Sequence, residues 1–150
     1  MTKKEIAMKN FTEGYNCAQS VALAFCEEIG MAPATVAQLM SGFGGGVARL
    51  REVCGAVSGM AFVMSSLYGY NNAEKGPAKI EFYGKIQSLA HEFEDKNGSI
   101  VCRELMGLDI KHDTPNASPR TPEFYQKRPC VELVGDVAEI LDKYLGTCNE

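Results

Sequence analysis

The apolar residues of the chain recur at intervals of three and four positions, which is the spacing of one face of an α-helix. Glycine, proline and side chains that cap helices separate these stretches. No stretch of any length alternates apolar with polar residues, as a half-buried strand would. The pattern therefore predicts an all-α fold over residues 1–150, a single-domain compact bundle of about five to seven helices around a central apolar helix.

Residues that start and stop helices place the expected elements. Asn16 is a favourable N-cap, Gly30 is a favourable stop, and Pro33 fits the first turn of the next helix. Ser99 is expected to cap a short helix, and the polar segment 109–121 is expected to be a loop. The expected helices occupy residues 3–12, 17–29, 33–43, 47–68, 73–96, 100–107 and 129–146.

The segment 53–73 carries no charged side chain, which raises the question of a membrane span. Glycines and serines interrupt the segment, and no hydrophobic block is long enough to dominate it. A helix that is apolar on all sides can equally be the central helix of a bundle. We therefore expect a buried central helix and no membrane insertion.

Composition and charge favour a globular cytoplasmic protein. Of the 150 residues, 45% are apolar and 23% are charged, and the net charge of −4 comes without a basic tract, which disfavours nucleic-acid binding. The N-terminal lysines are not followed by an apolar leader, so we expect a cytoplasmic location. In a reducing compartment the six cysteines suit metal binding or redox chemistry better than static disulfides, with buried thiols as the alternative.

Four of the cysteines fall at or near expected helix starts: Cys17, Cys54, Cys102 and Cys130. A helix N-terminus offers unpaired N–H groups and partial positive charge, which lower the pKa of a thiol and favour a nucleophilic or metal-binding thiolate. The alternative is that small cysteine side chains merely tolerate crowded helix starts. Cationic residues lie near these cysteines in the sequence, namely Arg49, Arg51, Arg103, Lys127 and Arg128.

The spacing of the four cysteines matches no familiar local metal motif, because no two of them form a C-x-x-C pair. They can share a site only through tertiary structure. Cys26 follows Cys17 by nine residues, so we expect it on the opposite side of the same helix, in the core. Cys148 is expected in a frayed C-terminal tail.

Gly55 and Gly59 lie one helical turn apart, directly after Cys54. A glycine inside a helix costs about 1 kcal/mol relative to alanine, so the close approach of another group should compensate. That group is either the backbone of a neighbouring helix or a bulky cofactor at the cysteines.

Two further features have weaker functional interpretations. The glycine-rich segment 42–46 follows no strand and lacks Gly-Lys-Ser/Thr, so we expect a tight connection rather than a phosphate-binding loop. Glu52 is expected to cap the central helix, to pair with Arg49 or to relay a proton, and His112 is expected in solvent.

Five short motifs occur along the chain in the order GYNCAQSV, GFGGG, CGAVSG, RELMG and RPC. Together they resemble the C_GCAxxG_C_C family of redox-active proteins, which is named for its cysteine pattern. The resemblance extends over residues 14–134. It leaves Cys26 and Cys148 outside the pattern and assigns the family's cysteines to Cys17, Cys54, Cys102 and Cys130.

The resemblance implies a redox or electron-transfer protein. A related domain accompanies haem in split-Soret-type cytochromes, where an iron–sulfur cluster on the cysteines has been inferred. The haem-attachment motif C-x-x-C-H is absent from this chain, so no haem is expected. Genes of the family often lie near transporter genes, which suggests a context but no mechanism.

The leading hypothesis is that the four cysteines bind an iron–sulfur cluster and serve an unidentified redox partner. Three alternatives stay open: thiol–disulfide chemistry without metal, a structural zinc site, and a helical binding module associated with a transport system. The long uncharged helix would also suit a homodimer. The residues expected to surround the cofactor are Gly55, Gly59, Arg49 and Arg128.

Overall fold

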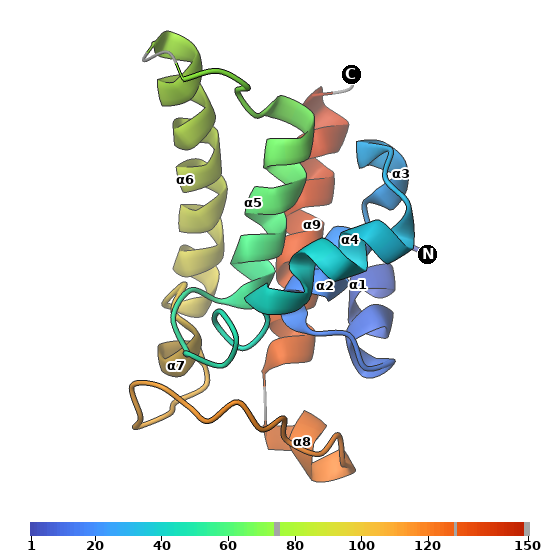
Figure 1. The fold of residues 1–150 in the computed structure, drawn as a ribbon, viewed down its shortest axis with the longest axis vertical. Coiled ribbons are helices and arrows are strands. Elements are labelled where there is room, and N and C mark those ends of the chain that lie inside the picture. The colour runs from blue at the N-terminus through green and yellow to red at the C-terminus, as the bar shows by residue number, and fades with distance from the viewer. Residues whose placement is uncertain (74–75, 128, 149–150) are drawn as a thin grey trace.

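The structure is a computed structural model that describes residues 1–73, 76–127 and 129–148, with residues 126, 127, 147 and 148 described by their backbone alone. In this part of the chain all regular structure is helical, apart from one isolated β-bridge between Val53 and Val101. The prediction of a compact all-α fold is confirmed (Figure 1).

The described residues form nine α-helices and one short 3₁₀ helix, η1, which is more elements than the sequence pattern indicated. The helix over residues 122–127 was not expected, and it follows the predicted loop 109–121 directly. The elements are α1 (Lys3–Thr12), α2 (Cys17–Leu23), α3 (Cys26–Ile29), α4 (Pro33–Met40), η1 (Ser41–Phe43), α5 (Gly55–Tyr68), α6 (Pro77–Asn97), α7 (Cys102–Leu105), α8 (Pro122–Lys127) and α9 (Cys130–Cys148).

Side-chain caps explain where the first two helices begin. Thr2 accepts a hydrogen bond from the N–H of Glu5, whose carboxylate accepts one from the N–H of Thr2. Asn16 and Gln19 form the same reciprocal pair at the start of α2. Each pair satisfies N–H groups that have no partner within the helix. The prediction that Asn16 is an N-cap is confirmed, and it makes Cys17 the first residue of α2.

The helix expected over residues 17–29 is divided into α2 and α3. The N–H groups of Ala24 and Phe25 bond to carbonyls three residues back rather than four, which tightens the end of α2, and Phe25 is fully buried at this turn. Cys26 therefore begins α3, and the prediction of one continuous helix is wrong. The Cys26 side chain does pack against the core, but it stays half-buried.

A left-handed turn replaces the expected start of the central helix. Gly45 and Gly46 adopt positive φ without steric cost, whereas such angles cost other residues about 1–3 kcal/mol each. The N–H groups of Arg51 and Glu52 bond to the carbonyls of these two glycines and close the turn. The helix expected from residue 47 thus begins only at Gly55. Four non-glycine residues in the turn also have positive φ: Val47, Ala48, Arg49 and Arg51.

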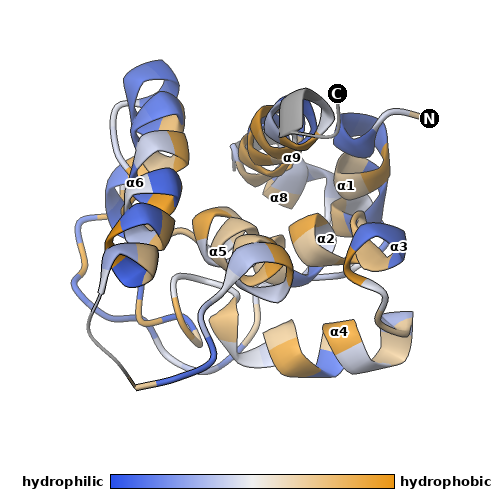
Figure 2. Ribbon diagram, turned by 90° about the horizontal axis from the view of Figure 1, so that it is seen from above, coloured by the Kyte–Doolittle hydropathy of each residue, from blue (hydrophilic) through white to orange (hydrophobic). Residues whose placement is uncertain are grey.

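The helix α5 lies in the middle of the bundle, between α6 on one side and α2 on the other (Figure 2). The helix α1 packs along α9, and α9 in turn contacts α2, α5 and α6. Two serines near the end of α5, Ser65 and Ser66, are exposed to solvent. None of the described helices has the length and apolar character needed to cross a bilayer. The largest fully buried side chains of the core are Phe25, Phe93, Met60, Met64 and Leu141.

Gly59 lies where α2 packs on α5. A Cβ atom at this position would fall 2.8 Å from the carbonyl oxygen of Ala18 and 3.1 Å from Cβ of Val21. Of the two groups expected to approach Gly59, the backbone of a neighbouring helix is the one observed; a cofactor contact at Gly59 stays a prediction.

Candidate functional site

The four cysteines of the predicted pattern all lie at helix starts. Cys17, Cys102 and Cys130 are the first residues of α2, α7 and α9, and Cys54 is the N-cap of α5. The cap of α7 differs from the expectation, because the hydroxyl of Ser99 accepts a hydrogen bond from the N–H of Val101 instead of capping the helix. The four helix starts belong to segments that are far apart in the sequence.

The tertiary fold brings these four cysteines to the wall of one small cavity of about 30 Å³. Cys54, Cys102 and Cys130 are buried, and Cys17 is half-buried. The cavity is otherwise lined mainly by apolar and glycine residues, together with Arg51. From the sequence, the four cysteines could share a site only if the tertiary structure brought them together. The fold meets this condition.

Two backbone segments hold Cys54 and Cys102 next to each other. The N–H of Cys54 donates to the carbonyl of Ile100 at 2.7 Å, and the N–H of Cys102 donates to the carbonyl of Glu52 at 2.6 Å. This short pairing ties the start of α5 to the start of α7. A Cβ atom on Gly46 would lie 2.7 Å from Cβ of Cys102, so the left-handed turn also packs directly on this cysteine.

Gly55 allows a third cysteine, Cys17, to approach the start of α5 closely. A Cβ atom on it would lie 3.0 Å from Cβ of Cys17, a distance tighter than ordinary packing. Gly55 also lines the cavity, whereas Gly59, one turn further along, contacts only the α2 backbone and side chains among its nearest neighbours. The two expected cofactor-binding glycines therefore have different surroundings.

The pKa values of two of the four site thiols, Cys17 and Cys54, are raised, which corrects the expectation that helix starts lower them. A hydrogen bond with Cys130, burial, and the other thiols nearby all raise the pKa of Cys17. Burial raises the pKa of Cys54 to about 12, although the N–H groups of Ala56 and Val57 donate to its sulfur and favour the thiolate. Burial and like charge outweigh the helix terminus here. A thiolate at these positions needs a compensating cation.

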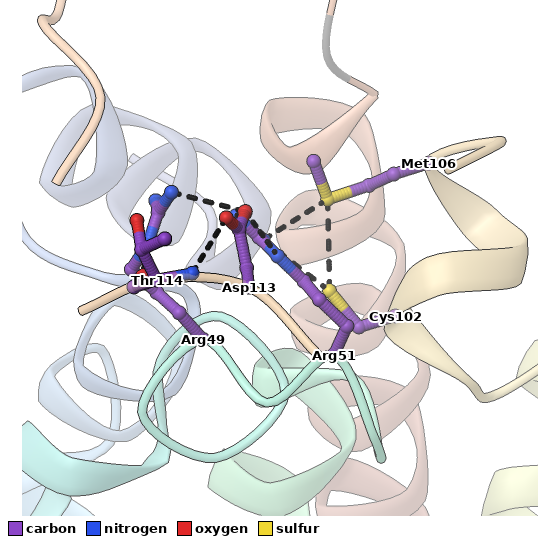
Figure 3. Close-up of polar contacts among 6 residues, drawn as sticks. All are labelled: Arg49, Arg51, Cys102, Met106, Asp113 and Thr114. Carbon is purple, nitrogen blue, oxygen red and sulfur yellow. Dashed lines mark hydrogen bonds and ion pairs between the residues drawn. The ribbon is translucent and has the colours of Figure 1, made fainter. Parts of the chain in front are cut away.

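Arg51 provides the buried positive charge beside the cysteines (Figure 3). It is only 2% exposed, and its Nη1 lies 3.7 Å from Sγ of Cys102 and 3.5 Å from Sδ of Met106. Its Nη2 lies 2.9 Å from Oδ2 of Asp113. From the sequence, Arg51 was expected only as a cationic neighbour of the cysteines, and Arg49 was expected beside the cofactor, because nothing in the local sequence distinguishes the two arginines.

Arg49 lies on the other side of Asp113 from Arg51 and Cys102 (Figure 3). Its Nη2 contacts Oδ2 of Asp113 at 3.0 Å, and its Nε donates to the carbonyl of Thr114 at 2.7 Å. The hydrogen bond from Arg51 holds the pKa of the Asp113 carboxyl below its usual range. Asp113, in the predicted loop, was not recognised as a site residue, since the contact spans more than sixty positions.

Glu52 turns away from the cavity toward a second ion-pair cluster. Its carboxylate contacts Arg103 at 3.1 Å and His112 at 3.0 Å, rather than Arg49. These two partners lower the pKa of the Glu52 carboxyl. His112 is half-exposed, as expected for a residue in solvent, but it has this specific partner.

The donor set fits a metal centre built on sulfur. Four cysteines and Met106 line the cavity, and soft sulfur ligands of this kind suit iron–sulfur clusters and zinc. As the side chains stand, no three His, Cys, Asp or Glu groups among the described residues are gathered closely enough to hold a metal ion. The five cysteines with described side chains are thiols. Arg128 and the side chain of Cys148 lie outside the described residues.

A family model described as "Putative redox-active protein (C_GCAxxG_C_C)" matches residues 15–144. No curated protein and no solved structure matches the chain.

Proposed function

The chain belongs to the C_GCAxxG_C_C family, and on that premise we propose that it is an electron-transfer protein that holds an iron–sulfur cluster on Cys17, Cys54, Cys102 and Cys130. The observation that supports this proposal most strongly is that four cysteines from four separate helices line one cavity. Chance packing of small buried side chains gives no reason for all four to meet at helix starts.

The surroundings of the cavity favour a bound anionic centre. When bound, a cluster supplies one-electron transfer that side chains cannot provide. The chain contributes positive charge around it: Arg51 lies against the sulfur of Cys102, and the N–H groups of Ala56 and Val57 are aimed at the sulfur of Cys54. Hydrogen bonds to ligand sulfurs raise the reduction potential of such centres.

The raised pKa values of Cys17 and Cys54 fit this function better than they fit a thiol nucleophile. A thiol that is protonated at neutral pH reacts slowly with electrophiles. A metal ion, in contrast, displaces the proton and stabilises the thiolate that it binds. The site is therefore better suited to coordination than to attack on a substrate.

One observation favours a second candidate, thiol–disulfide exchange. The sulfurs of Cys17 and Cys130 are within hydrogen-bonding reach of each other, so this pair is the one that would cycle. Forming that disulfide releases two protons and two electrons to an external acceptor, and reduction returns them.

The decisive experiment is anaerobic purification followed by iron, acid-labile sulfide and zinc analysis and a visible absorption spectrum. We expect iron and sulfide in the wild type and in the Cys26→Ser control, and their loss in Cys54→Ser. Wild-type iron content in Cys54→Ser contradicts the proposal. Zinc without sulfide indicates the structural zinc site, and a colourless protein with a reversible Cys17–Cys130 disulfide indicates thiol exchange.

A further inference from the structure

A second and larger cavity, of about 370 Å³, opens beside the four-cysteine cavity. The two cavities share Cys17, Gly45, Arg51 and Cys130 in their walls. The larger one has the size of pockets that bind small molecules. A molecule held in it would lie against the cysteine pair Cys17 and Cys130.

The wall of this cavity is positively charged in a chain whose net charge is −4. Three arginines line it, Arg49, Arg51 and Arg120, and no aspartate or glutamate is among its described lining residues. Arg49 and Arg51 share one carboxylate, Asp113, which approaches them from the neighbouring loop (Figure 3). The positive charge of the wall therefore exceeds the negative charge that compensates it.

Arg120 contributes a charge with no carboxylate partner in the described part of the chain. It donates to the main-chain oxygens of Phe11 and Tyr15 at 3.0 and 3.2 Å. Its guanidinium also lies 4.4 Å from the ring centroid of Phe11 and 4.9 Å from that of Phe124. These contacts fix the group in place but leave its charge available to a ligand.

Arg49 also keeps donor capacity toward the cavity. Its hydrogen bonds use Nε and Nη2, which leaves Nη1 without an acceptor among the described residues. A guanidinium has five N–H donors in a planar fork that matches a carboxylate or a phosphate. Around these polar groups the wall is apolar, with Phe11, Phe124 and Pro115. An organic body with one anionic group complements such a surface better than a bare inorganic ion does.

We propose that this cavity, termed here the arginine pocket, binds a small organic anion and places it against Cys17 and Cys130. The anionic group, carboxylate or phosphate, is bound by Arg49 and Arg120, and the apolar part packs on the accessible surfaces of Phe124 and Pro115. That the bound molecule would lie beside a redox centre rests on the proposed function. The binding itself does not depend on it.

The first test is calorimetric titration of the full chain, as purified anaerobically, with benzoate, phenyl phosphate and neutral benzyl alcohol. We expect at least one of the two anions to bind about tenfold more tightly than the alcohol, and which one does so distinguishes a carboxylate site from a phosphate site. Arg49→Gln and Arg120→Gln should each weaken that binding by about tenfold. Lys111→Gln removes an exposed charge from the same loop and should leave it unchanged.

The second test locates the anion beside the cysteines. The reduced, chelator-treated full chain is alkylated with anionic iodoacetate or neutral iodoacetamide, and each cysteine is followed by peptide mass spectrometry. We expect the iodoacetate-to-iodoacetamide rate ratio at Cys17 to exceed that at Cys26 by about tenfold. Bound benzoate or phenyl phosphate should slow the iodoacetate reaction at Cys17 but not at Cys26.

The proposal is overturned if neither anion binds more tightly than benzyl alcohol, or if Cys17 and Cys26 give equal rate ratios. An equal loss of binding in Lys111→Gln would also overturn it, because general surface charge would then explain the result. Iron content reports the proposed function separately. If the protein binds the anion but contains no iron, the arginine pocket is retained and the cluster is rejected. If it contains iron but binds no anion, the cluster is retained and the arginine pocket is rejected.

Discussion

Arg51 is the residue on which the polar contacts beside the cysteines converge. Its guanidinium reaches the sulfurs of Cys102 and Met106 on one side and the carboxylate of Asp113 on the other. It is buried, although its backbone has the unfavourable φ of +59°. A strained backbone at a buried charged residue is typical of positions that function fixes.

Replacing Arg51 with Gln should lower the free energy of unfolding by about 2 kcal/mol, because the substitution removes the hydrogen bonds that the buried guanidinium makes with Asp113 and with the sulfur of Cys102. Arg51→Lys keeps the charge but not the fork, so we expect a smaller loss. Neither substitution relieves the backbone strain at position 51. The difference in the free energy of unfolding is measured by urea unfolding followed by circular dichroism. Equal stability of Arg51→Gln and wild type would show that the contacts with Asp113 and sulfur contribute nothing net.

Asp113 should make stability depend on pH in the acid range. Its pKa is lowered in the folded chain by the hydrogen bond from Arg51, below the ordinary value of about 3.9 in an unfolded chain. Its contribution to stability is therefore fully present above about pH 4 and is lost as the pH falls through the lower folded pKa. Asp113→Asn should be less stable at neutral pH and lose less stability on acidification. Parallel pH profiles of the two proteins, measured by urea unfolding, would contradict this assignment.

At the scale of the elements, the contact between α2 and α5 positions two of the four cysteines. Gly55 and Gly59 of α5 lie against Cys17 and Ala18 of α2, with less room than a Cβ atom needs. This packing explains why the sequence tolerates two glycines in the first turns of its central helix.

Gly59→Ala should destabilise the protein by about 1–2 kcal/mol, since the overpacking against Ala18 exceeds the gain in helix propensity. Gly84→Ala is the matched control, because Gly84 lies inside α6 and a Cβ atom there meets no atom within 4 Å. That variant should instead be stabilised by about 0.5–1 kcal/mol. Thermal and urea unfolding of the two variants test the contrast. A stabilised Gly59→Ala would mean that α2 moves away at little cost.

Helix boundaries were predictable where the determinants are local. The reciprocal cap of Asn16 and Gln19 begins α2 at the expected residue, and Gly30 ends α3 with the left-handed conformation expected of it. The boundary near residue 47 was not predictable, because there non-glycine residues adopt positive φ. Tertiary contacts hold that turn, including the hydrogen bond from the N–H of Asp113 to the carbonyl of Arg49.

At the scale of the whole molecule, the sequence indicated which cysteines belong together but not how they meet. Their placement at helix starts follows from local pattern, and the fold confirms it. Their common cavity depends on the packing of α2, α5, α7 and α9, which no local pattern encodes. The same reason explains why the contacts of Arg51, the role of Asp113 and the arginine pocket were not predicted: each depends on contacts between segments more than fifty residues apart.

Because the four cysteines come from four helices, a bound cluster would join those helices, and its binding energy would contribute to folding. On the proposed function, removing the metal with a chelator under anaerobic conditions should lower stability by about 4 kcal/mol, which corresponds to saturation at about 1,000 times the dissociation constant. For a chain of 150 residues, that loss lowers the Tm by roughly 8–16 °C. Calorimetry before and after chelation measures the shift.

The Cys26→Ser variant should show the same difference in Tm between the untreated and the chelated protein, since Cys26 lies outside the cavity. Cys54→Ser should abolish the difference, because its untreated form already lacks the metal. If chelation leaves the Tm of the wild type unchanged, the four helices are joined by packing alone.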